Sequence, residues 1–198
     1  IPGSLVGSEM CIRDSHWVWE SGFEIHTGIN FTKETVLEAF PISLVTIDPG
    51  IYDHKEFQFV MFTNPNNKTS FRNRTYIGGY FGGSRISSSN KVNLRLGDKF
   101  NAETNFNYNR LKLPNGLTNV VITGVRLAYS FTPRMFLQSL VQYNNVSEIT
   151  SVNARFGWLK NANTGLFVVI NIVKDNDFLN QLNNQSITIK YSYQFDLL

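Results

Sequence analysis

The chain of 198 residues has one cysteine, six prolines and no long run of apolar residues. A single thiol, Cys11, excludes a disulfide within the chain and any metal site built from several cysteines. The longest apolar stretch covers residues 166–170, whereas a transmembrane helix needs roughly 18 apolar residues, so no such helix is expected. Charged residues make up only 17% of the chain and form no basic cluster, and the net charge is +3, which argues against nucleic-acid binding.

Aromatic residues, in contrast, are abundant. They make up 14% of a chain that is 42% hydrophobic, a composition that indicates a folded domain rather than disorder. From Trp17 to Phe31, the larger apolar side chains fall mainly on odd positions and the polar ones on even positions. This period of two predicts a β-strand, and its length exceeds that of an ordinary globular strand.

The same alternation recurs along the chain. It is clearest in residues 92–96, 101–108, 121–131, 152–158 and 186–195, and the segments 56–63, 69–80, 135–143 and 166–173 also fit strands. The pattern predicts about ten strands and no helix.

The connections between these strands are expected to alternate in length. Short turns are predicted at 64–68, 97–100, 132–134 and 160–165, and longer polar loops near 32–55, 81–91, 112–119, 144–150 and 174–184. Short turns at one end of a meander and long loops at the other are typical of outer-membrane barrels.

Aromatic residues gather near one end of the predicted strands, on the apolar side of the alternation. We expect these to lie at a membrane interface: Trp17, Trp19, Tyr129, Phe131, Trp158, Tyr193 and Phe195. The opposite side carries charges that we expect to face a polar lumen: Glu20, Glu24, Arg72, Arg74, Arg95, Glu103, Arg126, Arg155 and Lys190. Closure into a barrel is expected because an open sheet edge in lipid would leave backbone groups without hydrogen bonds.

These features together predict an all-β fold, an up-and-down antiparallel transmembrane β-barrel in the outer membrane of a Gram-negative-type bacterium. The alternative is a soluble β-sandwich or a lipocalin-like barrel, in which one sheet face is also apolar. Strand length, the placement of the aromatic residues and the alternation of loop lengths favour the membrane protein.

Residues 5–15 read LVGSEMCIRDS, which resembles the translation of a transposase adapter used to prepare sequencing libraries. We therefore expect residues 1–15 to be an artefact, and residues 16–198 to be the C-terminal part of an incomplete barrel domain. A signal peptide is the competing interpretation, but Glu9, Arg13 and Asp14 interrupt any apolar segment.

The last third of the chain carries a family resemblance. The segments RLAYSFTPRMFLQSLVQYNN, VNARFGWLKNANTGLFVVIN and ITIKYSYQF resemble the C-terminal barrel of a bacterial family of unknown function, and GGYFGGSR and PGIYDHKEFQF upstream fit the same pattern. Members of that family typically follow a carbohydrate-binding module similar to family 9. The resemblance implies an outer-membrane location and a sugar-binding module upstream, but it supplies no catalytic motif.

Few residues suggest chemistry. Glu24 and His26 share one face of a predicted strand, about 7 Å apart, and barrel-embedded hydrolases use comparable groups; a titratable lumen lining is the simpler interpretation. The run Asp175-Asn176-Asp177 matches no complete calcium loop, and the glycine-rich segment 78–83 lacks the lysine of a phosphate loop. We therefore expect no catalytic, cofactor-binding or metal-binding residues, and no cofactor.

The expected function is a non-catalytic membrane scaffold or anchor, with saccharide-related transport or binding in the full-length protein. Its expected partners are the lipid bilayer, the barrel-assembly machinery and saccharides bound by the upstream module. The lumenal arginines either brace the barrel wall or select anionic and polar solutes. Two alternatives remain open, an outer-membrane hydrolase whose chemistry lies upstream or in loops, and a soluble binding module.

Overall fold

The computed structural model describes residues 5–42, 45–161, 164–175 and 183–193, and every regular element among them is a β-strand. The strands are β1 (Leu5–Val18), β2 (Glu24–Val36), β3 (Phe40–Ile42), β4 (Val45–Ile47), β5 (Gly50–Phe62), β6 (Thr69–Tyr80), β7 (Gly83–Leu96), β8 (Phe100–Leu113), β9 (Gly116–Thr132), β10 (Met135–Asn144), β11 (Ile149–Asn161), β12 (Thr164–Asp175) and β13 (Asn183–Ser192). Across these described segments there is no helix of the length and hydropathy needed to cross a membrane.

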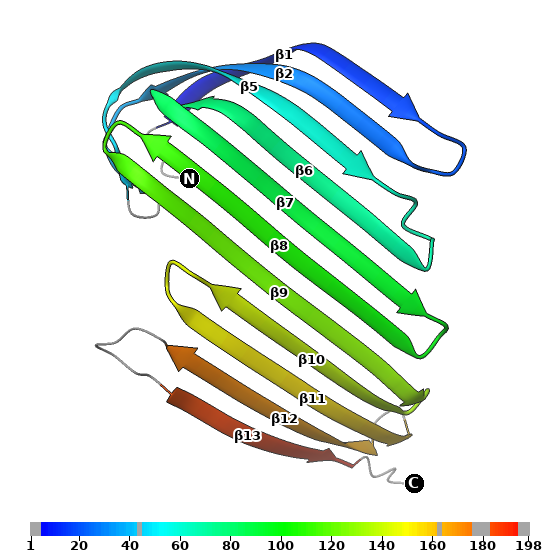
Figure 1. Ribbon diagram of the computed structural model, residues 1–198. Helices are drawn as coiled ribbons and strands as arrows, with labels where there is room; N and C mark the ends of the chain where they lie inside the picture. Colours follow the sequence, from blue (N-terminus) through cyan, green and yellow to red (C-terminus); the bar gives the residue numbers. More distant parts are fainter. Residues whose placement is uncertain (1–4, 43–44, 162–163, 176–182, 194–198) are drawn as a thin grey trace, which may run out of the picture. The chain divides into compact units, whose positions relative to one another are not determined.

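Eleven of the strands form one sheet in the order β1-β2-β5-β6-β7-β8-β9-β10-β11-β12-β13 (Figure 1). Each neighbours the next along the chain, except that the small hairpin β3–β4 is inserted between β2 and β5. The all-β, antiparallel, up-and-down architecture is therefore confirmed. In the described part of the chain, β1 and β13 are the two end strands of this order.

The alternation of side chains explains where the strands lie, since a pleated strand directs successive residues to opposite faces. The less regular segments 56–63, 69–80, 135–143 and 166–173 all lie in or largely within strands. Residues 5–15, which the sequence interpretation sets aside, lie in β1, and Leu5 is aligned with Val36 of β2.

The predicted alternation of loop lengths is wrong at three places. The connection predicted as a long loop near 144–150 is only residues 145–148, shorter than the connection 63–68 that was predicted to be short. The segment 81–91 is not a long loop, because β7 begins at Gly83 and only Phe81 and Gly82 connect it to β6. Residues 112–119 likewise hold a turn of two residues, 114–115, between β8 and β9. Both residues of the β6–β7 turn have positive φ angles, 42° at Phe81 and 75° at Gly82, the backbone conformation that suits a two-residue hairpin.

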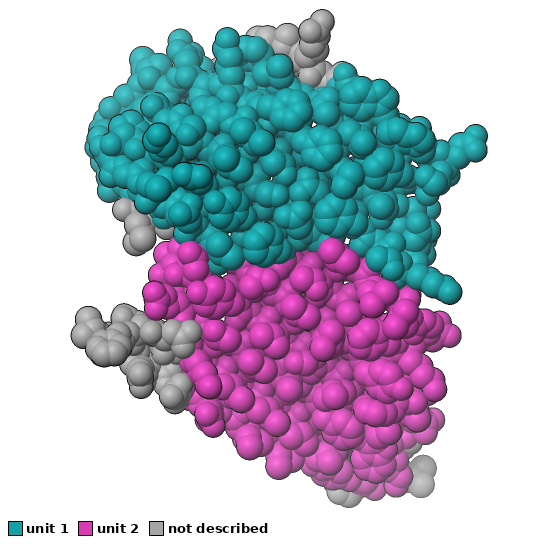
Figure 2. All heavy atoms as spheres, in the orientation of Figure 1, with its two compact units in different colours: residues 1–91, 106–121 teal, residues 92–105, 122–198 magenta. Residues whose placement is uncertain are grey.

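The chain divides into two compact units, coloured separately in Figure 2. Unit 1 comprises residues 1–91 and 106–121, and unit 2 comprises residues 92–105 and 122–198.

Unit 1 contains a small hydrophobic core at the end of its strands where β2 leads into the β3–β4 hairpin. Its buried members are Val36, Val45, Ile47, Phe81, Leu111 and Leu113. Phe81, at the tip of the β6–β7 turn, meets Tyr80, Tyr52 and Phe40 with ring centroids 4.7, 5.3 and 5.7 Å away. This aromatic packing offsets the cost of a positive φ angle at a bulky residue.

Unit 2 has no comparable core. Every buried hydrophobic side chain in the described part of the chain belongs to unit 1. The strands β9 to β13 of unit 2 instead present large apolar side chains that remain exposed.

Candidate functional site

The two faces of the unit 2 sheet differ sharply in chemistry. The register places Leu137 of β10 opposite Tyr129 of β9 and Phe156 of β11. The same row continues through Val168 of β12 to Ile189 of β13. One line of side chains across five strands is therefore wholly apolar.

These apolar side chains are uncovered, most of all on β13. Ile187 is 70% exposed, Ile189 68% and Tyr191 63%, and no described hydrophobic residue of unit 2 is buried. A protein that folds in water would cover such an apolar face with a second layer of secondary structure.

Aromatic residues mark one end of this face, where β9, β11 and β13 end (Figure 1). Tyr129 and Phe131 touch edge to face at 4.8 Å, and Tyr191 and Tyr193 stack at 6.5 Å. Trp158 of β11 lies opposite Leu166 and is exposed.

Two other predicted interface aromatics belong to unit 1. Trp17 lies opposite Ile25 near the end of β1, and the Trp19 ring lies 5.0 Å from that of Phe23 across the following turn. Both tryptophans are exposed. Phe195, the seventh predicted interface aromatic, lies outside the described residues.

The opposite face of unit 2 carries Arg126 and Arg155. Arg155 lies opposite Gln138, and Arg126 is separated from Asn153 only by Leu140 of the intervening strand. These five residues, with Ala128 and Ser139, line a cavity of about 250 Å³. The Arg155 guanidinium also lies over the ring of Phe167, at 5.1 Å, so the cavity combines cationic and amide groups beside an aromatic ring.

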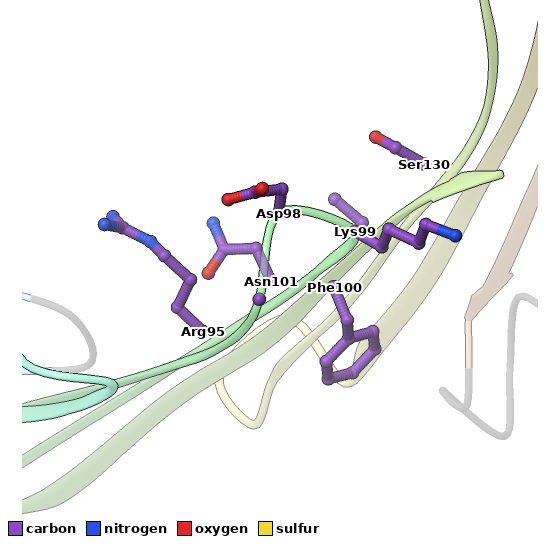
Figure 3. Close-up of a pocket in the computed structure, with 8 residues that line it drawn as sticks. Arg95, Asp98, Lys99, Phe100, Asn101 and Ser130 are labelled. Carbon is purple, nitrogen blue, oxygen red and sulfur yellow. The ribbon is translucent and has the colours of Figure 1, made fainter. Parts of the chain in front are cut away.

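A second cavity, of about 230 Å³, lies at the β7–β8 turn (Figure 3). Arg95, Asp98 and Asn101 extend to one side of the ribbon, while the Phe100 ring points to the other. The Ser130 amide donates to the Lys99 carbonyl at 2.7 Å, which holds the turn against β9. Of the remaining charges predicted for this face, Lys190 lies opposite Phe167, and Glu103 lies on β8.

In unit 1, the register also brings predicted lumen residues to one face. Glu24, Phe62 and Arg72 form one row across β2, β5 and β6, and His26, Val60 and Arg74 form the next. The Arg72 guanidinium lies over the Phe62 ring at 5.5 Å. Glu20 is instead an exposed residue of the β1–β2 turn.

The histidine cluster on this face is larger than the predicted Glu24 and His26 pair. A Glu24 carboxylate oxygen lies 3.2 Å from His26 Nε2 and 3.0 Å from His16 Nε2. The two imidazole rings lie 3.8 Å apart because His16 is directly opposite His26 in the hairpin. The β1–β2 register, which places residue 16 opposite residue 26, is the signal that would have added His16.

A second polar contact that the sequence analysis did not single out joins β5 and β7. Arg85 donates to both oxygens of the buried Glu56 carboxylate, and its guanidinium lies 4.1 Å from the Tyr80 ring centroid. Arg85 and Glu56 are separated by 29 positions in the sequence, which leaves no local sequence signal for this pair.

Compared with known proteins, the chain matches no family model, no curated protein and no solved structure. The family resemblance of its last third therefore stays a prediction.

Proposed function

We propose that the chain is a segment of an outer-membrane β-barrel that acts as a non-catalytic scaffold, with the apolar face of unit 2 against lipid. The observation that carries this proposal is the uncovered row from Tyr129 through Leu137 to Ile189. Lipid is the solvent in which such a face needs no second protein layer.

The dimensions of unit 2 support the same proposal. Strands β10, β11, β12 and β13 contain 10, 13, 12 and 10 residues. A tilted strand crosses the hydrocarbon layer with roughly 9–11 residues. Aromatic side chains at the strand ends, such as Trp158 and Tyr193, suit the interface between lipid and water, where an amphipathic ring is stable.

The polar face of unit 2 suggests which solutes such a barrel binds or passes. Arg126, Arg155 and Asn153 line one cavity beside an aromatic ring, a combination suited to anionic or hydroxyl-rich solutes such as saccharides. We assign this face to the water-filled interior and propose passage or binding of such solutes as its role. An upstream sugar-binding module, implied by the family resemblance, would deliver them.

The proposal requires closure. In lipid, the outer edges of β1 and β13 need hydrogen-bond partners, either each other or further strands of a longer domain. The barrel-assembly machinery of the outer membrane is the partner that would complete this pairing.

The test is folding of the purified chain with and without detergent. We expect a monomer only in detergent or lipid, with gel migration that changes on heating, because a closed barrel resists dodecyl sulfate until it is boiled. A folded monomer in buffer alone would contradict the proposal and favour the soluble binding module.

A further inference from the structure

We propose that His16, Glu24 and His26 form a binding site for a divalent transition metal of the zinc type. Their donor atoms, one from each residue, all lie within 4.8 Å of one another. Two imidazole nitrogens and one carboxylate oxygen are a ligand set that zinc sites use when a further position stays open to water or substrate.

Two of the three distances between donor atoms are compatible with a bound metal ion. The Glu24 oxygen is 3.0 Å from one imidazole nitrogen and 3.2 Å from the other. Ligands about 2.0–2.2 Å from a tetrahedral zinc ion are spaced at just over 3 Å from each other. An ion can replace the two hydrogen bonds if side-chain rotation also brings the third pair of donor atoms, which lies within 4.8 Å, to a similar spacing.

The backbone holds the three residues on one face. His16 and His26 are a directly opposed cross-strand pair, and Glu24 lies two residues from His26, opposite Val18. The hairpin is closed by two backbone hydrogen bonds of 2.9 Å between Trp19 and its partners Phe23 and Gly22. A ligand set on a fixed hairpin has little conformational entropy to lose when it binds an ion.

The surroundings leave the site accessible. All three side chains are partly exposed, so water or an anion can reach the open coordination position. The cations that share this face, Arg72 and Arg74, lie beyond Phe62 and Val60 of β5. Neither separates the carboxylate from the two imidazoles, and the site uses only the β1–β2 hairpin, so it does not depend on the proposed membrane function.

The test is titration of the folded chain, in detergent or in buffer according to where it folds, with Zn²⁺ by calorimetry and with Co²⁺ by visible absorption. A Cys11→Ser background removes the one thiol of the chain as a competing ligand. We expect one ion per chain and a Co²⁺ spectrum of low coordination number.

Three single variants, His16→Ala, His26→Ala and Glu24→Gln, are each expected to weaken Zn²⁺ binding by about 10-fold or more, since losing even a second-sphere partner costs about that much. Glu20→Gln is the matched control, because it removes an exposed carboxylate from the turn of the same β1–β2 hairpin. This variant should bind Zn²⁺ as the parent does. Circular dichroism confirms that each variant is folded. No binding by the folded parent, or unchanged affinity in any of the three variants, would overturn the site.

Discussion

Arg85 donates two hydrogen bonds to the carboxylate of Glu56, from Nε to Oε1 at 2.8 Å and from Nη2 to Oε2 at 2.6 Å. The Glu56 side chain is only 6% exposed, so this bidentate pair is the main compensation for a charge taken out of water. It joins β5 to β7 across β6, and the sequence pattern alone does not give the register of these three strands.

Replacement of Arg85 by Met should therefore destabilise unit 1. Loss of the guanidinium leaves the Glu56 carboxylate buried without its partner, which costs about 3 kcal/mol in the free energy of unfolding. Denaturant titration followed by tryptophan fluorescence measures this change. The control is Arg74→Met, an exposed arginine on the neighbouring strand, which should shift stability by less than about 0.5 kcal/mol. Equal effects of the two variants would show that the Arg85–Glu56 pair does not stabilise unit 1.

The apolar face of unit 2 is tested by Ile189→Arg. In a bilayer, an arginine there should destabilise the protein by about 2–4 kcal/mol and reduce the heat-modifiable form. In water the substitution would be nearly neutral, because Ile189 is already 68% exposed.

The matched control for that variant is Thr188→Arg, one residue earlier and on the opposite face, beside Val169. We expect Thr188→Arg to assemble as the parent does. If both variants assembled equally well into vesicles, the apolar face would not be the lipid-facing one.

Gly78→Ala should disrupt the pairing of β5 with β6. A Cβ at this position would lie 2.2 Å from the Lys55 carbonyl oxygen and 2.6 Å from the Glu56 Cα, both rigid backbone atoms. We expect loss of the folded form, or a stability decrease far beyond that of Gly97→Ala, measured by the same denaturant titration.

Gly97 provides the comparison because an added Cβ there meets nothing within 4 Å, although its φ angle is +59°. Gly97→Ala should lower the free energy of unfolding only by the cost of a left-handed backbone conformation at alanine, about 1 kcal/mol. Similar losses of stability in Gly78→Ala and Gly97→Ala would mean that the backbones of β5 and β6 do not lie as close together at Gly78 as the structure shows.

The two arginines of the larger cavity should set ion selectivity if the polar face lines a pore. Arg126→Gln together with Arg155→Gln should lower the preference for anions over cations in planar bilayers, because both guanidinium groups line the same space. Arg134→Gln is the control, since Arg134 lies in a turn and donates to the Lys160 carbonyl. Absence of any conductance by the intact protein would contradict passage of solutes, although not membrane insertion.

The strands were largely predictable from the sequence. A pleated strand directs successive side chains to opposite faces, so a strand with one apolar face shows alternating apolar and polar residues. Most of β7 was missed for a physical reason: its first half is rich in serine and shows no apolar alternation. Two of those serines donate hydrogen bonds to β8, Ser87 to Asn109 and Ser89 to Asn107, each at 2.6 Å. A strand stabilised by hydrogen bonds between side chains resembles a polar loop in sequence.

The candidate sites were predictable only in part, because they depend on register. Glu24 and His26 were paired correctly on one strand, but the addition of His16 needs the exact alignment of β1 with β2. The Arg85–Glu56 contact depends on the three-strand arrangement of β5, β6 and β7 and has no local signature.

The last strand of the sheet has a consequence for the behaviour of the chain in water. Among the described residues, β13 is paired with β12 on one side only, and it displays Ile187, Ile189 and Tyr191. An exposed apolar edge strand can pair with strands of other molecules. In water we therefore expect this edge to favour association between chains until another strand pairs with it.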